Sequence, residues 1–191
     1  MMRRVLFVAV LAALVAGCTS PSENPDAPPP AAAETPNPFA PCPTQLDQAV
    51  AAGSALPPLA FECVGGGTLD LARAPGVPTV VNLWGSWCGP CREELPFLQE
   101  FADAAGDQVR VLGVISKDGV PQAQSFASDT GVRLPSAFDG EGELMAELGL
   151  NGLPYTAFLA ADGTLVHSEL GPVESVDELA SLVAEHLGVR L

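Results

Sequence analysis

Short apolar runs rich in β-branched residues alternate with amphipathic stretches along most of this chain. The run 78–84 (PTVVNLW) is short and apolar, which is typical of a strand buried on both faces, and 109–115 has the same character. Ala161-Asp162-Gly163 is a turn signal that predicts a hairpin. The remaining predicted strands are 56–64, 68–71, 136–138, 155–160 and 164–170.

Helical patterns lie between and after these strands, at 88–105, 121–129, 143–148 and 176–187. Pro96 should kink the first helix, and Gly131 should end the second. Ser175 is a cap candidate for the last helix, with Glu178 at the capping-box position. Strands that alternate with helices, followed by a hairpin and a final helix, predict an α/β fold in which helices flank both faces of a mixed central sheet.

The start of the chain has the layout of a bacterial export signal. Arg3 and Arg4 precede the apolar run 5–16, which is shorter than the roughly 20 residues that span a membrane. The end of the run, Val-Ala-Gly-Cys18, resembles the bacterial lipobox, in which the Cys receives a lipid group and cleavage precedes it. We therefore predict a lipoprotein signal peptide at 1–17 and lipid attachment at Cys18. The alternative is an ordinary signal peptide with a chance Cys.

The segment 18–41 is rich in Pro and Ala and contains several acidic residues. Such a composition cannot bury enough apolar surface to offset chain ordering, so we expect a disordered tether. The globular domain is then 42–191, and acyl chains on Cys18 would anchor it to the outer face of the bacterial cell membrane.

The charge of the chain limits its partners. It has 23 acidic and 8 basic residues, for a formal net charge of -15 at pH 7. A field of that sign repels phosphate backbones, so we predict no binding of nucleic acid.

Two of the five cysteines stand three residues apart at a predicted helix start, in Trp87-Cys88-Gly89-Pro90-Cys91. Unpaired N–H groups and the helix dipole favour a thiolate at Cys88, which can attack a disulfide. Cys91, one turn further on, is close enough to displace the resulting mixed disulfide. Pro90 suits an early helical position, and Gly89 leaves room for another chain.

Other uses of a Cys-x-x-Cys pair fit this sequence less well. A structural zinc site needs two more ligands at matched spacing, and the only histidines are His167 and His186. Attachment of c-type haem needs His after the second Cys, where this chain has Arg92. We therefore predict no metal and no bound cofactor beyond the dithiol.

Cys42 and Cys63 remain, and an exported protein folds in an oxidising compartment. They are a candidate structural disulfide that would close a loop of about 20 residues. Four cysteines permit three pairings, and the competing hypothesis leaves Cys63 as a lone buried thiol.

The segment 82–96 (NLWGSWCGPCREELP) resembles the active-site segment of the TlpA/ResA branch of the thioredoxin superfamily. The segment 152–156 (GLPYT) is similar to the second signature of that branch, in which the Pro is cis. The resemblance covers roughly 56–188. It implies a thioredoxin fold with an N-terminal β extension and a central helical insertion around 121–150.

The resemblance also implies roles for individual residues. Cys88 would be the exposed nucleophile, Cys91 the resolving thiol, and Pro154 the cis-Pro loop that faces them. Glu94 would be the acid/base for Cys91, because Asn82 stands where thioredoxins carry a buried acid. The alternative is that Glu94 is a solvated surface residue. The side chains and backbone predicted to line the substrate groove are Trp87, Gly89, Pro90 and Leu153.

These observations predict an enzyme, an extracytoplasmic thiol–disulfide oxidoreductase acting on exported proteins. As a reductant, which the Gly-Pro dipeptide favours, it would receive electrons from a membrane partner and reduce targets such as apocytochrome c. As an oxidase, it would donate disulfides to folding secreted proteins. A third hypothesis is a binding lipoprotein with a static disulfide on a thioredoxin scaffold. We expect a monomer.

Overall fold

The structure is a computed structural model that describes residues 36–50 and 55–191. The predicted signal peptide, Cys18 and most of the predicted tether lie outside the described residues. The described part nevertheless begins earlier than the expected domain start at residue 42. Phe39 is 4% exposed, and its ring centroid lies 6.2 Å from that of Trp84. This large apolar side chain is buried in the core although the stretch around it is rich in proline. Residues 36–41 are therefore part of the folded domain.

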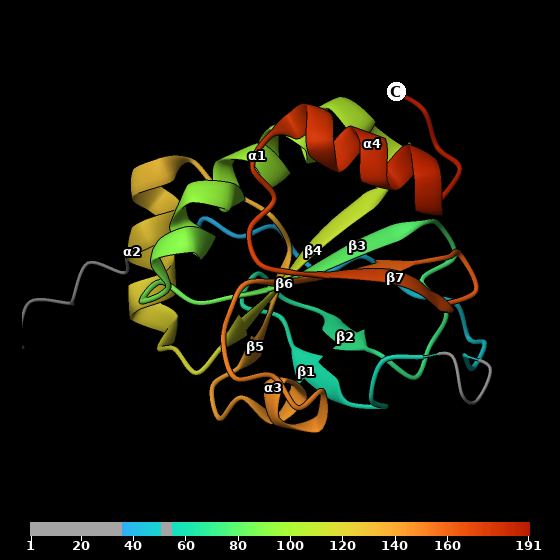
Figure 1. Ribbon diagram of the computed structural model, residues 1–191. Helices are drawn as coiled ribbons and strands as arrows, with labels where there is room; N and C mark the ends of the chain where they lie inside the picture. The colour runs from blue at the N-terminus through green and yellow to red at the C-terminus, as the bar shows by residue number, and fades with distance from the viewer. Residues whose placement is uncertain (1–35, 51–54) are drawn as a thin grey trace, which may run out of the picture. The chain divides into compact units, whose positions relative to one another are not determined.

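The centre of the domain is a five-stranded mixed sheet in the order β5-β4-β3-β6-β7 (Figure 1). Its strands are β3 (Thr79–Trp84), β4 (Arg110–Ser116), β5 (Ser136–Asp139), β6 (Tyr155–Leu159) and β7 (Leu165–Leu170). β3 pairs in parallel with β4 and antiparallel with β6, and every residue of β3 is buried. The apolar β-branched run at 78–84 therefore forms the central strand, as its composition predicts.

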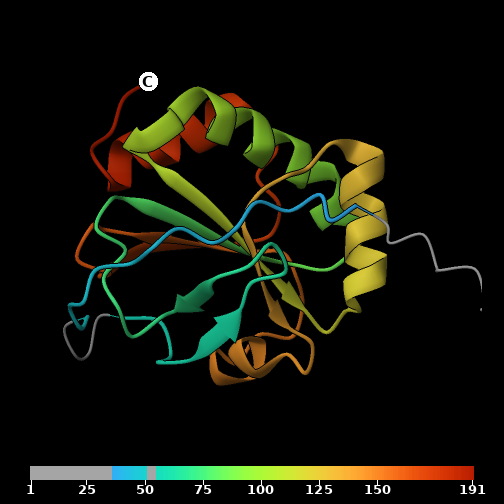
Figure 2. The ribbon, with the colours of Figure 1, turned by 180° about the vertical axis from the view of Figure 1, so that it is seen from behind.

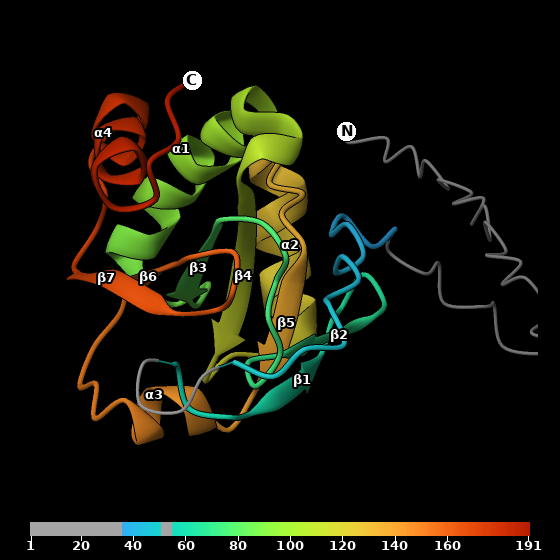
Figure 3. The same ribbon diagram turned by 90° about the vertical axis from the view of Figure 1, so that its right-hand side faces the viewer.

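Helices and a hairpin cover the two faces of the sheet, which confirms the predicted α/β fold (Figures 1 and 3). The flanking elements are α1 (Gly89–Ala105), α2 (Val120–Thr130), α4 (Val176–His186), the 3₁₀ turn η1 (Gly106–Gln108), α3 (Glu143–Glu147), β1 (Ala60–Glu62) and β2 (Thr68–Asp70). α1, α2 and α4 bury one hydrophobic cluster against the sheet, and the β1–β2 hairpin and α3 bury a second cluster on the other face.

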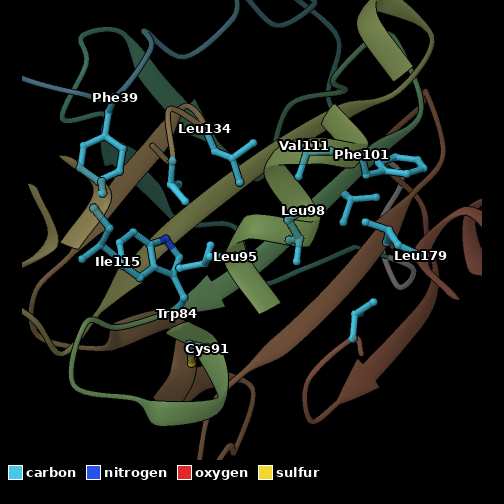
Figure 4. Close-up of a cluster of buried hydrophobic side chains, with 14 of the residues drawn as sticks. Phe39, Trp84, Cys91, Leu95, Leu98, Phe101, Val111, Ile115, Leu134 and Leu179 are labelled. Carbon is cyan, nitrogen blue, oxygen red and sulfur yellow. The ribbon is translucent and has the colours of Figure 1, made fainter. Parts of the chain in front are cut away.

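The larger cluster lies directly behind the predicted redox motif. Trp84, Leu95, Leu98 and Phe101 are fully buried in it, and Cys91 belongs to the same cluster (Figure 4). Trp84 comes from β3, whereas α1 contributes the other four side chains from one stripe and continues past Pro96 to Ala105. Burial of that stripe fixes the start of α1 against the end of β3.

The N-terminal segment 36–50 packs along the β1–β2 hairpin and crosses the face seen in Figure 2. Asn37 Nδ2 donates to the carbonyl oxygen of Val64 at 2.6 Å, and the N–H of Cys42 donates to that of Gly66 at 2.9 Å. At Gly65 a Cβ atom would overlap the carbonyl oxygen of Ala40, so this close approach of two backbones requires glycine. Within the described residues, no helix is both long and apolar enough to cross a membrane.

Candidate active site

The redox pair lies at the start of α1, directly after the turn that follows β3. Cys88 is the N-cap of α1, and its Sγ accepts the N–H of Cys91 at 3.2 Å. The two sulfurs form a disulfide with an S–S distance of 2.08 Å and a Cα–Cα distance of 5.3 Å. Since the first N–H groups of a helix lack partners within it, Cys88 occupies a position that stabilises negative charge on sulfur.

The two cysteines differ little in exposure, so Cys88 is not the exposed member of the pair that the resemblance implies. Cys88 is 4% exposed and Cys91 is fully buried. Trp87 is 54% exposed, and a Cβ atom added at Gly89 would meet no atom within 4 Å. The open approach to the dithiol is therefore beside Trp87 and Gly89, two of the residues predicted to line the substrate groove.

The Leu153–Pro154 peptide bond is cis, as the family resemblance implies. Leu83 of β3 pairs with Tyr155 of β6, so the antiparallel register brings Pro154 opposite Trp84, at the end of β3 where the Cys88 turn begins. The carbonyl oxygen of Pro154 accepts the N–H of Gly171 at 3.0 Å, which holds this loop to the end of β7.

Glu94 is fully buried, so it is not the solvated surface residue of the alternative hypothesis. Its Oε1 accepts Nδ2 of Asn82 at 2.8 Å, and its Oε2 accepts the N–H of Val173 at 3.0 Å. Burial raises its pKa from 4.5 to about 7, against the opposing effect of these two hydrogen bonds. Glu94 follows Cys91 by three residues, so both side chains lie on the same buried face of α1.

Asn82 connects the carboxyl group to the sheet. Its Nδ2 also donates to Oγ1 of Thr156 on β6 at 2.9 Å, while its buried Oδ1 has no hydrogen-bond partner among the described residues. Asn82 thus occupies the position of the thioredoxin acid and donates a hydrogen bond to the carboxyl group that lies on α1.

Cys42 and Cys63 form the second disulfide, with a Cα–Cα distance of 6.0 Å. The bond joins the segment 36–50 to the turn after β1, and Cys63 also forms an isolated β-bridge with Ala137 of β5. The structure therefore has the pairing that the cysteine count left open, and Cys63 is not a lone thiol.

Sequence reasoning missed the two charged side chains that bind the redox turn. Asp118 Oδ2 accepts the N–H of Ser86 at 2.6 Å, and Arg92 Nη1 donates to the carbonyl oxygen of Ser86 at 3.2 Å. The signal for Asp118 was limited to its place in a Lys-Asp-Gly turn directly after a buried strand, which does not reveal what its carboxylate contacts.

Comparison with known proteins agrees with this geometry. Residues 51–183 match the Redoxin family, and residues 2–19 match the prokaryotic membrane lipoprotein lipid attachment site. The second match supports the predicted exported, membrane-anchored class of protein.

Individual relatives are similar over most of the folded part. The thiol:disulfide interchange protein DsbE of Vibrio cholerae is 32% identical over 136 residues, which cover 70% of this chain and 72% of the relative. The thiol-disulfide oxidoreductase ResA of Bacillus subtilis is 23% identical over 120 residues, which cover 62% and 67% of the two chains. The crystal structure of a secreted Mycobacterium tuberculosis disulfide oxidoreductase homologous to E. coli DsbE matches with a TM-score of 0.58 and 28% identity. That match covers 67% of this chain and 96% of the other.

The strand–turn–helix that carries the dithiol, the thioredoxin-like sheet and the relatives all indicate the same chemistry. The chain therefore belongs to the Redoxin family and is a thiol–disulfide oxidoreductase.

Proposed function

We propose that this protein reduces disulfides of exported proteins from the outer face of the bacterial cell membrane, to which lipid on Cys18 anchors it. The observation that carries the proposal is the Cys88–Cys91 pair at the start of α1, with an open approach beside Trp87 and Gly89. The Gly-Pro dipeptide between the cysteines, which thioredoxin-like reductants share, favours reduction over oxidation.

The reaction needs only the two sulfurs and a proton carrier. The Cys88 thiolate attacks one sulfur of the substrate disulfide, forms a mixed disulfide and releases the first substrate thiolate. The Cys91 thiolate then attacks Sγ of Cys88, forms the Cys88–Cys91 disulfide and releases the second substrate thiolate. Two electrons pass to the substrate, and the enzyme is left in the oxidised state that the structure describes.

Glu94 is the proton carrier in this scheme. Cys91 must lose its proton before it attacks, and a carboxyl group with a pKa of about 7 accepts a proton readily near neutral pH. Pro154 and Leu153 complete the substrate groove, because a cis-Pro loop offers backbone groups to an extended substrate segment.

The electrons for each new cycle must come from outside the folded domain. We propose that a membrane electron-transfer protein reduces Cys88–Cys91, that apocytochrome c before haem attachment is a substrate, and that the enzyme acts as a monomer. The competing proposal is an oxidase that gives its disulfide to folding secreted proteins.

The function is tested with the Cys91→Ser variant of the exported protein. We expect it to accumulate a covalent mixed disulfide with reducible substrates, whereas Cys88→Ser should form none. The wild-type protein should reduce insulin with dithiothreitol as the electron source. A dithiol reduction potential of about -270 mV would agree with a reductant, whereas one of about -120 mV would favour the oxidase. Absence of exchange in the wild type would leave a static binding protein.

A further inference from the structure

Two charged side chains from outside the turn 85–88 bind one residue within it. Asp118, in the loop after β4, accepts the N–H of Ser86 through Oδ2 at 2.6 Å. Arg92, in α1, donates from Nη1 to the carbonyl oxygen of Ser86 at 3.2 Å. Both backbone polar groups of Ser86 are thus bound by side chains of opposite charge, and hydrogen bonds to ionised groups are stronger than neutral ones.

This turn places the attacking group. The N–H of Cys88 donates to the carbonyl oxygen of Gly85 at 3.0 Å, which closes the turn. A Cβ atom at Gly85 would lie 2.5 Å from Nε1 of Trp87, so the indole lies over the glycine. Because Trp87 is 54% exposed, much of its ring has no protein contact, and its place depends on the backbone of the turn.

Asp118 is aimed at this turn by a backbone conformation that few residues adopt. Lys117, which precedes it, has a φ of +52° and is the one residue other than glycine with positive φ in 36–50 and 55–191. Outliers of this kind persist where the surroundings determine them, and they are often found at functional sites. Oδ1 of Asp118 accepts the N–H of Gly119 at 2.8 Å. Among the residues that the structure describes, no ion pair involves Asp118.

We propose that Asp118 is a positioning residue of the redox centre, which holds Trp87 and Cys88 in place for attack by accepting the Ser86 N–H. The proposal rests on thiol–disulfide exchange by Cys88 and Cys91. Attack requires the Cys88 sulfur to approach the substrate disulfide in a narrow range of geometry, so a loosened turn slows the exchange step. Asp118 acts on the turn through the charge-assisted hydrogen bond that it accepts from Ser86, and not by changing the pKa of the Cys88 thiol.

A role for the charge alone makes a different prediction. A carboxylate near Cys88 repels its thiolate, so removing that charge would lower the pKa of the Cys88 thiol. Asp118→Asn removes the charge and keeps one carbonyl oxygen, which can accept the Ser86 N–H while the Gly119 N–H loses its acceptor. Asp118→Ala removes both.

The experiment measures kcat/KM for reduction of a protein disulfide, together with the pH profile of Cys88 alkylation, in the exported full-length protein. We expect Asp118→Ala to lower kcat/KM about tenfold with an unchanged alkylation midpoint, since a lost hydrogen bond to a charged group has effects of this order. Asp118→Asn keeps one neutral acceptor for the Ser86 N–H, so it should lose less rate than Asp118→Ala, about threefold. Asp129→Ala, which removes an exposed acid from α2, is the matched control and should match wild type.

The proposal is overturned if Asp118→Ala retains the wild-type rate, or if both Asp118 variants lose rate equally with a midpoint moved to lower pH. If Asp118→Ala does not fold, Asp118→Ser takes its place, because its shorter side chain does not reach Ser86. Exchange by the wild type and the Asp129→Ala control tests the proposed function separately, so its failure is read from those two proteins alone.

Discussion

The buried carboxyl group of Glu94 should make the stability of the oxidised protein depend on pH in a defined direction. Its pKa is 4.5 in an unstructured chain and about 7 in the fold, because burial disfavours the charged form. Below pH 4.5 the group is protonated in both states. Between pH 4.5 and about pH 7 the folded protein keeps the proton and the unfolded chain loses it, so the free energy of unfolding falls as pH rises. Above about pH 7 this contribution of Glu94 to stability is fully lost.

The size of the effect follows from the same two values. A difference of one pKa unit corresponds to about 1.4 kcal/mol, so the rise from 4.5 to about 7 corresponds to about 3 kcal/mol. Glu94→Gln removes the titration and keeps the size of the side chain. It also changes the hydrogen bonds with Asn82 and Val173, but that change is independent of pH.

The assay is urea unfolding of the wild type and of Glu94→Gln at a series of pH values from 4 to 8, with both disulfides intact and ionic strength fixed. We expect the free energy of unfolding of the wild type to fall by about 3 kcal/mol relative to the variant across this range. Glu93→Gln, an exposed neighbour, is the matched control and should follow the wild type. A difference between wild type and Glu94→Gln that stays flat with pH would refute the reasoning.

Two further predictions concern the N-terminal segment. Replacing both Cys42 and Cys63 by Ser should lower the free energy of unfolding by about 3 kcal/mol, because the disulfide closes a loop with a sequence separation of 21. The variant should still reduce insulin, and an unchanged free energy of unfolding in urea would contradict the prediction. Phe39→Ala should lower the free energy of unfolding by about 3 kcal/mol, because the ring is 4% exposed and packs on Trp84. The control Leu46→Ala, at a side chain that is 49% exposed, should lower it by less than about 1 kcal/mol, and equal losses would show that Phe39 is not part of the core.

Local pattern was sufficient for the elements that are both buried and regular. The run 78–84 predicted β3 correctly, because a central strand that is buried on both faces consists largely of apolar and β-branched residues. The strand predicted at 56–64 is shorter in the structure, where β1 is Ala60–Glu62. Pro57 and Pro58 have no N–H to donate to a neighbouring strand, so they do not extend it. Composition also misassigned 36–41 to the tether, because an average over many prolines and alanines conceals one Phe that reaches the core.

The candidate site divides along the same line. The three-residue spacing at a helix start identifies Cys88 and Cys91, and the family resemblance adds Glu94, which follows Cys91 by three residues and shares its face of the helix. What that spacing does not reveal is the proton affinity of Glu94, since its partners come from β3 and from Val173, which is 79 residues away in sequence. Asp118 is likewise 32 residues from the turn that it binds. The motif therefore identifies the two sulfurs that exchange, whereas the proton affinity of Glu94 and the position of the turn depend on contacts that only the folded sheet brings together.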